Sequence, residues 1–377
     1  MKKQASPVAA EVGWAEVHEF RLARHHLLER APKSRLAQVV GDIGGAQAQV
    51  MSAAELQIAV RVDCSAEDVR EALWKKKSLV KTWLMRGTLH LIPSADLPIY
   101  TGAMGAHGLR NLNAWLKFLK LTEPELKSIF DGIASALNGT PITREELVAA
   151  VGRGKSEHVR SVMRSGWGGV LKPAARQGSL CFGPSRGQSV TFVSPRAWLP
   201  SWREIEPTQA LTEAATGYLR AYGPATKHDF ARWWGAWPGV GTEAWKVLDD
   251  RLVTVSVEGQ PAQMLAADVK HLSKAPTRSV QLLPGFDPYL MGHANRDHLF
   301  DKVHRWKVSR VAGWISPVIL VDGRVLGVWS HTLSKQELKV ELKPFAPLQP
   351  RVVKEARARA EGIADALGAK LGKVSVA

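Results

Sequence analysis

The sequence has few cysteines and no motif typical of a metal or nucleotide-cofactor site. Its two cysteines, Cys64 and Cys181, form no Cys-x-x-Cys pair and show no Cys/His ligand spacing. Disulfide scaffolds and zinc sites use denser patterns than this. A phosphate-binding loop of the G-x-x-x-x-G-K type is also missing. We therefore expect no disulfide framework, no metal and no cofactor.

Long apolar runs are missing as well. No run is long enough to cross a bilayer as a helix. The N-terminal stretch MKKQASPVAAEVG carries positive charge but lacks the apolar core of a signal peptide. The expected location is a reducing cytoplasm.

Acidic residues are scarce relative to basic ones. The chain has 51 lysines and arginines against 35 acidic residues, so its formal net charge is +16. This positive field favours a polyanionic partner, nucleic acid ahead of an anionic membrane surface. Charge that serves only solubility is the alternative. The 45% hydrophobic content is ordinary for a globular protein, and 377 residues allow two to four domains.

One supersecondary pattern occurs three times along the chain. It places helices ahead of a β-hairpin, the plan of a winged helix-turn-helix. In the first copy we predict helices at residues 15–29, 52–61 and 66–74 and a hairpin within 79–92. The second of these helices is predicted to begin at a capping box formed by Ser52 and Glu55, and the third at Ser65.

The second and third copies follow the same order. The second has predicted helices at 123–137, 144–151 and 155–164 and strands at 179–182 and 189–193. The third has predicted helices at 210–221, 227–234 and 242–250 and strands at 252–257 and 262–265. Thr122, Thr143 and Thr226 stand at the expected N-caps.

The C-terminal hundred residues differ from these copies. They predict a hairpin over 318–329 with an Asp-Gly turn, a strand at 339–342 and a helix at 351–367. We therefore predict a mainly helical α+β fold with β wings. Its parts are winged-helix units at residues 1–105, 106–203 and 204–278 and a C-terminal α+β piece at 279–377, packed on the third unit.

Two glutamines, Gln47 and Gln49, stand one small residue apart just before the helix predicted at 52–61. In an extended segment their side chains project in the same direction, whereas in a helix they diverge by roughly 200°. Two solvated surface glutamines are the ordinary interpretation of such a pair. The rest of the chain makes a functional role more plausible.

Five segments of the chain occur in an order that resembles the winged-helix family of AlkZ-like DNA glycosylases. They are GAQAQ (45–49), KTWLMRGTLHLIP (81–93), YGPATKHDFARWWG (222–235), LLPGFDPYLMG (282–292) and VDGRVLGVW (321–329). The resemblance covers roughly residues 14–367. Gln-x-Gln resembles the AlkZ-type branch, and Gln49 argues against another branch that carries Gln-x-Asp.

The resemblance implies tandem winged helices that form a curved basic channel for double-stranded DNA. It also implies a glycosylase that unhooks interstrand crosslinks and removes bulky N7-alkylpurines, often as self-resistance in producers of DNA-alkylating natural products. By similarity, Gln47 and Gln49 form the catalytic pair, with Gln47 the more critical. No lysine can be nominated as a Schiff-base nucleophile, which favours a monofunctional enzyme.

Glutamine suits this chemistry. A purine alkylated at N7 is cationic and already a good leaving group, so a general acid is unnecessary. The enzyme has to position a water at the anomeric carbon and stabilise an oxocarbenium-like transition state. A glutamine carbonyl can accept a hydrogen bond from that water and face the developing positive charge. Such a neutral site should leave normal purines alone.

Other residues are candidates for binding DNA. They are Arg86, His90, Lys75, Lys76, Lys77, Lys155, Arg160 and Arg164. A hydrogen-bonded strand histidine is the competing interpretation for His90, and a solvated wing residue for Arg86. Lys75, Lys76 and Lys77 are interpreted as a solvated helix end that also touches phosphates.

We do not favour a functional role for four further residues, Asp287, Trp233, Trp234 and Trp237. Asp287 resembles a general base, but we interpret it as a cap of the turn at Pro288. The three tryptophans are interpreted as core residues rather than base-stacking residues.

Two function classes stay open. The first is a DNA glycosylase, acting as a monomer on double-stranded DNA that contains alkylated purines. The second is a non-enzymatic DNA-binding protein such as a transcription regulator, because winged helices mostly bind DNA without chemistry. Three winged units in one chain and a glutamine pair outside any recognition helix favour the enzyme.

Overall fold

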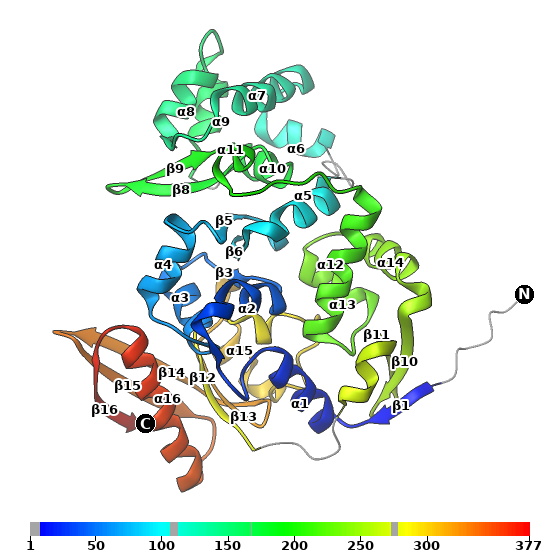
Figure 1. Ribbon diagram of the computed structural model, residues 1–377, viewed down its shortest axis with the longest axis vertical. Helices are drawn as coiled ribbons and strands as arrows, with labels where there is room; N and C mark the ends of the chain where they lie inside the picture. The colour runs from blue at the N-terminus through cyan, green and yellow to red at the C-terminus, as the bar shows by residue number, and fades with distance from the viewer. Residues whose placement is uncertain (1–7, 106–111, 167, 273–277) are drawn as a thin grey trace, which may run out of the picture. The chain divides into compact units, whose positions relative to one another are not determined.

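The computed structural model describes residues 8–105, 112–166, 168–272 and 278–377 and shows a mixed α+β protein (Figure 1). The chain divides into two compact units. Unit 1 combines residues 1–70 with 215–377, and unit 2 is residues 71–214. The first seven residues of the N-terminal stretch interpreted above lie outside the described residues. The finer division into four parts stays a prediction.

Unit 1 takes its helices from both ends of the chain. They are α1 (Trp14–Arg24), α2 (Leu36–Asp42), α3 (Met51–Ala59), α13 (Lys227–Trp234), α14 (Pro238–Val247), α15 (Arg305–Val308) and α16 (Pro350–Ala366). The unit boundaries fall within α4 (Ala66–Trp74) and α12 (Pro207–Tyr222). The helix predicted at 15–29 is too long, because α1 ends at Arg24 and His26 adopts a left-handed φ of 53°.

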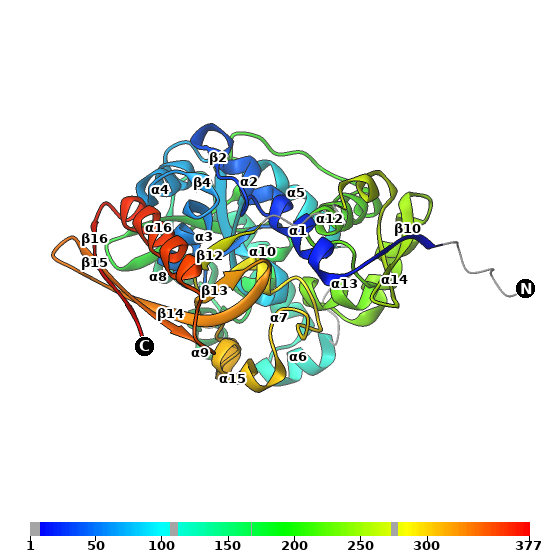
Figure 2. The same cartoon turned by 90° about the horizontal axis from the view of Figure 1, so that it is seen from below.

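The larger sheet of unit 1 has five strands. Their order is β12 (Val280–Leu283), β13 (Val318–Val321), β14 (Arg324–Ser334), β15 (Glu337–Pro344) and β16 (Lys370–Val376). Neighbours are antiparallel except β15 and β16, which are parallel. Helix α16 packs on this sheet, with Ala356 and Ala360 buried in their shared core (Figure 2). The hairpin and helix predicted near the C-terminus are confirmed.

The Asp-Gly turn between β13 and β14 is confirmed in detail. Asp322 and Gly323 have φ values of 49° and 81°, as a two-residue hairpin turn requires. A Cβ on Gly323 would lie 2.3 Å from Cβ of His18, so only glycine fits against helix α1.

A second sheet of unit 1 has three strands. Strand β10 (Leu252–Val257) is antiparallel to β11 (Gln260–Leu265), which confirms the predicted pair. Strand β1 (Val8–Val12) adds to β10 in parallel and was not predicted. The remaining strands of unit 1 are β2 (Ala31–Pro32), β3 (Ala46–Gln47) and β4 (Val62–Asp63).

Unit 2 has its own helices and strands. Its helices are α5 (Leu97–Gly105), α6 (Leu112–Leu119), α7 (Glu123–Ala136), α8 (Arg144–Val151), α9 (Glu157–Arg164), α10 (Leu171–Arg176) and α11 (Pro195–Trp198). Its strands are β5 (Leu79–Trp83), β6 (Leu89–Pro93), β7 (Ile142–Thr143), β8 (Cys181–Arg186) and β9 (Ser189–Val193). Its core includes Trp83, whose ring meets Phe182 edge-on at 4.6 Å.

Most of the predicted helix starts are confirmed. The side chains of Thr122, Thr143 and Thr226 each accept a hydrogen bond from the backbone N–H three residues on. Ser65 does the same for α4, since its Oγ accepts from Asp68 N at 3.2 Å. These bonds satisfy backbone donors that a helix start leaves unpaired.

Neither cysteine forms a disulfide. Cys64 and Cys181 are buried free thiols, and burial raises the pKa of Cys64 to about 12. Within the described ranges, no helix combines the length and apolar character needed to cross a membrane.

Candidate active site

Gln47 lies in strand β3, directly after a tight glycine turn. Gly44 and Gly45 have φ values of 70° and 94°. A Cβ on Gly44 would lie 2.9 Å from Cζ2 of Trp233, so glycine lets the turn pack on this ring. The turn carries Gln47 into the fold, where the residue is only 5% exposed.

The buried side chain of Gln57 holds the backbone at Gln47. Gln57 lies in α3, and its Nε2 donates to the carbonyl oxygens of Gln47 (3.2 Å) and Gly285 (3.0 Å). One amide group therefore joins two segments that are far apart in the sequence. Gln57 Oε1 has no hydrogen-bond partner among the described residues. A buried acceptor in this state is available to a water or a ligand.

An ion pair beside Gln57 ties the same two segments together. Arg61 and Asp287 are completely buried, and Nη1 and Nη2 of Arg61 donate to the two Asp287 carboxylate oxygens at 2.8 and 2.6 Å. Arg61 Nη1 also donates to Gln57 O at 2.7 Å. Asp287 additionally accepts from Tyr289 N at 3.0 Å, so its interpretation as a turn cap is confirmed. Because both oxygens hold partners, Asp287 acts as a structural group here.

Gln49 has a different environment from Gln47. Strand β3 ends at Gln47, and Gln49 lies in the bend that leads into α3. Gln49 is exposed, whereas Gln47 is buried. The two amides are therefore not presented side by side from one regular strand. Gln47 is the one whose position is fixed by packing.

The capping box predicted from Ser52 to Glu55 is wrong. Helix α3 begins at Met51, and its N-cap, Val50, makes no side-chain cap hydrogen bond. Glu55 is 3% exposed and accepts hydrogen bonds from Nε (2.8 Å) and Nη2 (3.1 Å) of Arg70. A two-bond guanidinium partner is worth more to a buried carboxylate than one backbone N–H, so Glu55 turns away from the helix start.

His90 is a hydrogen-bonded strand histidine, as the competing interpretation held. It is 2% exposed, and its Nδ1 lies 3.0 Å from Thr88 O. Its Nε2 lies 3.4 Å from Nη2 of Arg86, whose φ is 57°. Burial and the charge of Arg86 lower the pKa of His90 to about 3. His90 is therefore neutral at physiological pH and carries no charge to a phosphate.

The other candidate DNA-binding residues lie at the surface of unit 2. Lys75 and Lys76 reach Glu71 at 3.1 and 4.0 Å, and Lys77 Nζ lies 3.6 Å above the Trp198 ring. Exposed ion pairs of this kind contribute only about 0–1 kcal/mol. A phosphate can therefore replace such a partner at little cost.

Helix α9 presents the second basic group. Arg160 Nε and Arg164 Nη1 contact Glu157 at 2.8 and 2.6 Å, and Arg164 is 52% exposed. Lys155 precedes the helix and donates to Ser128 Oγ. Because one glutamate serves both arginines, this face keeps a surplus of positive charge.

The tryptophans divide into two classes. Trp233 and Trp234 are each 3% exposed, which confirms their place in the core. Trp237 is 40% exposed, so the core interpretation is wrong for this residue. It follows Gly235, where α13 ends in a left-handed turn, and occupies the N-cap of α14 outside the packed face.

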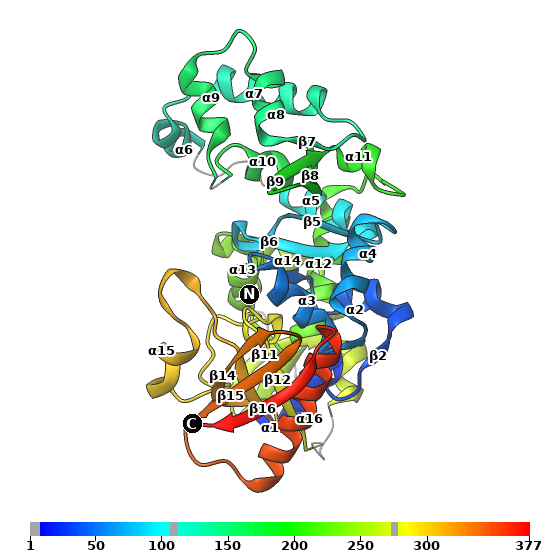
Figure 3. The same cartoon turned by 90° about the vertical axis from the view of Figure 1, so that its left-hand side faces the viewer.

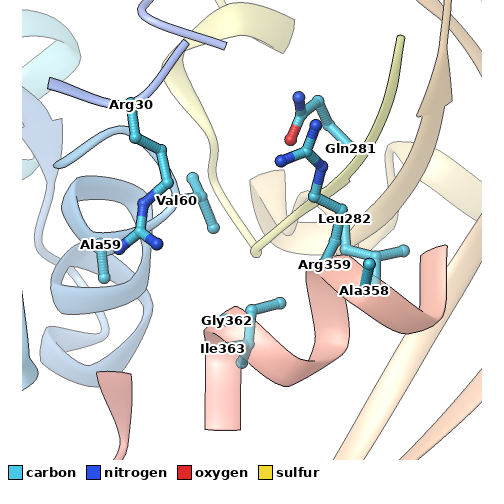
Figure 4. A pocket seen from close by; sticks show the side chains of 9 residues that line it. All are labelled: Arg30, Ala59, Val60, Gln281, Leu282, Ala358, Arg359, Gly362 and Ile363. Atoms are coloured by element: carbon cyan, nitrogen blue, oxygen red, sulfur yellow. The ribbon is translucent and has the colours of Figure 1, made fainter. Parts of the chain in front are cut away.

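A small, partly open cavity of about 70 Å³ lies elsewhere in unit 1 (Figure 4). Its lining residues come from α3 and the residue after it, from β12, from α16 and from Arg30, which precedes β2. Burial lowers the pKa of Arg359, and the charge of Arg30 adds to this shift. Gln47 and Gln49 do not line it. Ligand pockets are usually about 300–1,000 Å³. The cavity is therefore too small for a nucleobase and is not the candidate active site.

Sequence analysis missed the residues that position Gln47. Gln57 and Arg61 are polar residues that interrupt an apolar stretch four residues apart. This spacing was the available signal for buried polar side chains on one face of a helix. For metal ligands, no group of three or more histidine, cysteine, aspartate or glutamate side chains is assembled in the part of the chain that the structure describes.

Comparison with known proteins supports the family resemblance. The chain matches the family model "DNA glycosylase AlkZ-like" over residues 40–370. It is 37% identical over 369 residues to the interstrand DNA cross-link repair glycosylase of Streptomyces sahachiroi, covering 95% of this chain and 97% of that protein. The structure of Streptomyces sahachiroi DNA glycosylase AlkZ is similar with a TM-score of 0.87 and 35% identity, covering 97% of this chain and 100% of that chain. This protein therefore belongs to the family of AlkZ-like DNA glycosylases.

Proposed function

We propose that this protein hydrolyses the N-glycosidic bond of cationic N7-alkylated purines in DNA, including bulky adducts and interstrand cross-links, with Gln47 and Gln49 as its catalytic residues. The observation that carries the proposal is the similarity over 95% of the chain to a cross-link repair glycosylase. The fixed and buried position of Gln47, a neutral polar residue, supports its role.

Gln47 is suited to position water and to stabilise positive charge. Its backbone carbonyl is held by Gln57, so the side chain starts from a defined point. Preorganised dipoles of this kind act without reorganisation cost when charge develops in the transition state. Because an amide is neutral, the site depends on a leaving group that is already activated. Selectivity for cationic lesions follows from that dependence.

Tandem winged helices supply the proposed DNA-binding framework. In unit 2, helices α7, α8 and α9 precede the β8–β9 hairpin, the order of elements in a winged helix. Strand β7 pairs with β9, which supports a three-stranded wing. We extend the same interpretation to the copies that begin near residues 14 and 207. The net charge of +16 supports phosphate contacts along these units.

The test is excision from defined duplexes. Three substrates are compared: one with a single N7-methylguanine, one with an N7-linked interstrand cross-link, and one undamaged. We expect abasic sites from the first two and none from the third. Alkaline strand cleavage reports the abasic site, and strand separation on a denaturing gel reports unhooking.

Two outcomes would overturn the proposal. Binding to all three duplexes without any abasic product would favour a non-enzymatic DNA-binding protein. Equal excision from the undamaged duplex would show that the site does not depend on an activated leaving group.

A further inference from the structure

Residues 302–314, the α15 segment, expose large apolar side chains to solvent. Val303 is 69% exposed, Trp306 70% and Val311 89%. Single exposed apolar residues are normal, but several within one short segment mark an interaction site. Figure 3 shows the segment around α15 projecting from the body of unit 1.

The same segment is positively charged throughout. It contains Lys302, Arg305, Lys307 and Arg310, and no acidic residue occurs between Asp301 and Asp322. Lys302 contacts Asp297 at 3.3 Å. For the other three cations, no carboxylate of the described residues lies within 4.0 Å. Lys307 Nζ lies over the rings of Trp306 and Phe345 at 5.5 and 5.4 Å. Exposed apolar side chains set among cations without a carboxylate partner fit a polyanion that also has an apolar interior. Stacked base pairs with their phosphates have both properties.

The segment is held in a defined shape. Val308 is fully buried, Ser316 N donates to Val308 O at 2.9 Å, and Arg310 N donates to Trp314 O at 2.8 Å. The Trp314 ring packs edge-on against Phe286 at 4.9 Å. The exposed side chains are thus presented by an anchored loop.

The anchor connects the segment to Gln47. Phe286 N donates to Ile315 O at 3.3 Å, and the carbonyl of the preceding residue, Gly285, accepts from Gln57 Nε2 at 3.0 Å. The same Nε2 reaches Gln47 O. One short series of contacts within unit 1 therefore connects the base of the α15 segment to the backbone of the proposed catalytic glutamine.

We infer that the α15 segment is a DNA wedge: Trp306 inserts into the duplex next to the lesion and unstacks it, while Arg305, Lys307 and Arg310 hold the flanking phosphates. Apolar side chains that enter between base steps partly unstack them, and neighbouring cations attach to the backbone. The inference rests on the proposed function, because it takes the lesion-bearing duplex as the occupant. It adds an element that opens the helix at the site where Gln47 acts.

The experiment uses duplexes that carry N7-methylguanine beside a fluorescent 2-aminopurine, whose emission rises when it unstacks. The variants are Trp306→Ala, Trp306→Phe and Gln47→Ala. Phe118→Ala is the matched control, because Phe118 is an apolar residue of unit 2 that is 80% exposed. Thermal unfolding of each variant checks the fold, which should survive since Trp306 is mostly in solvent.

We expect the parent and Gln47→Ala to raise the emission, although only the parent excises. Trp306→Ala should lose the rise and excise about tenfold to a hundredfold more slowly, the range that loss of one aromatic–base stack suggests. Trp306→Phe should recover part of both signals, and Phe118→Ala should behave as the parent. Arg305→Gln/Lys307→Gln should lower the slope of log K against log salt by about 2.

The outcomes separate this inference from the proposed function. If the parent excises N7-methylguanine and Trp306→Ala matches it in emission and rate, the wedge is wrong and the proposed function stands. If the parent excises nothing, the proposed function fails, and the emission rise alone still decides the wedge. If Trp306→Ala instead abolishes binding to anionic lipid vesicles while the emission rise persists, the segment serves a membrane surface and the inference is overturned.

Discussion

The surroundings of Gln47 in unit 1 and helix α9 in unit 2 are both polar, but they are built in opposite ways. Around Gln47 the polar groups are buried and most of them hold specific partners, as in the fully buried pair of Arg61 and Asp287. On α9 they are exposed, and Arg160 and Arg164 share one glutamate. The buried arrangement fixes the positions of the groups around Gln47, whereas the exposed arrangement leaves positive charge at the surface for a partner.

Because of this difference, substitutions in the two regions should have different effects. Removing a buried, paired group exposes the full desolvation cost of its partner. Removing an exposed charge costs little stability, because water and salt already screen it. Changes near Gln47 should therefore affect folding or the chemical step, whereas changes on α9 should affect DNA affinity and its salt dependence.

The largest effect is expected from breaking the buried ion pair. Asp287→Ala leaves the Arg61 guanidinium buried without its carboxylate, and such a loss costs about 3–5 kcal/mol. Urea-induced unfolding should show this decrease in the free energy of unfolding of unit 1.

The matched control is another Arg–Asp pair of the same unit. Arg324 contacts Asp301 at 3.0 Å, with side chains 51% and 72% exposed. Asp301→Ala should change the unfolding free energy by less than about 1 kcal/mol. Equal losses in the two variants would remove the contrast between buried and exposed polar groups.

The next effect is a loss of stability in acid. Burial lowers the pKa of His18, His90 and His293 to about 3 each from an ordinary value of 6.5, with Arg21 or Arg86 adding to the shift. The unfolded chain therefore binds more protons than the folded chain between these values. Above about pH 6.5 these histidines do not lower the free energy of unfolding. Between about pH 6.5 and pH 3 the free energy of unfolding falls as the pH is lowered, by up to about 1.4 kcal/mol per pH unit for each histidine.

Urea unfolding at several pH values between about 7 and 5 measures this slope. His90→Gln should reduce the slope by one histidine's contribution. His228 is exposed at the surface, so His228→Gln serves as the control and should leave the slope unchanged. A parent protein whose stability is flat over this range would contradict the prediction.

The smallest effect on folding is expected on α9. Arg160→Gln/Arg164→Gln should leave thermal unfolding and the excision rate at saturating enzyme nearly unchanged. The slope of log K against log salt should fall by about 0.9 for each lost phosphate contact. Arg357→Gln, at a surface arginine of α16 outside the proposed winged units, should retain the parental slope. An unchanged slope in the double variant would show that α9 is not part of the DNA-binding surface.

Local sequence signals predicted much of the fold. Thr122, Thr143 and Thr226 cap helices at the predicted positions, and Asp322-Gly323 forms its turn. Each of these features depends on atoms within a few residues of one another. The Ser52–Glu55 prediction failed because its outcome depended on Arg70, a competing partner from another helix.

The candidate site depended more on distant contacts. The sequence singled out Gln47 and Gln49 as a pair, but it could not show that one is buried and the other exposed. That difference arises from the Gly44 turn against Trp233 and from the bridge of Gln57 to Gly285. Such contacts join segments nearly two hundred or more residues apart, so no local pattern contains them.

Single-turnover excision by Gln47→Ala tests the central claim most directly. The substrate is a duplex with one N7-methylguanine, and DNA affinity and its salt slope are measured on the same duplex. Gln38→Ala, at an exposed glutamine of α2, is the matched control. Gln49→Ala shows how much each glutamine of the pair contributes to the excision rate. We expect Gln47→Ala to lose about 10²–10³ in rate, as for one preorganised polar group. Its DNA affinity and salt slope should stay parental, because the lost side chain is neutral. Parental rates in both Gln47→Ala and Gln47→Ala/Gln49→Ala would contradict the assignment of catalysis to this pair.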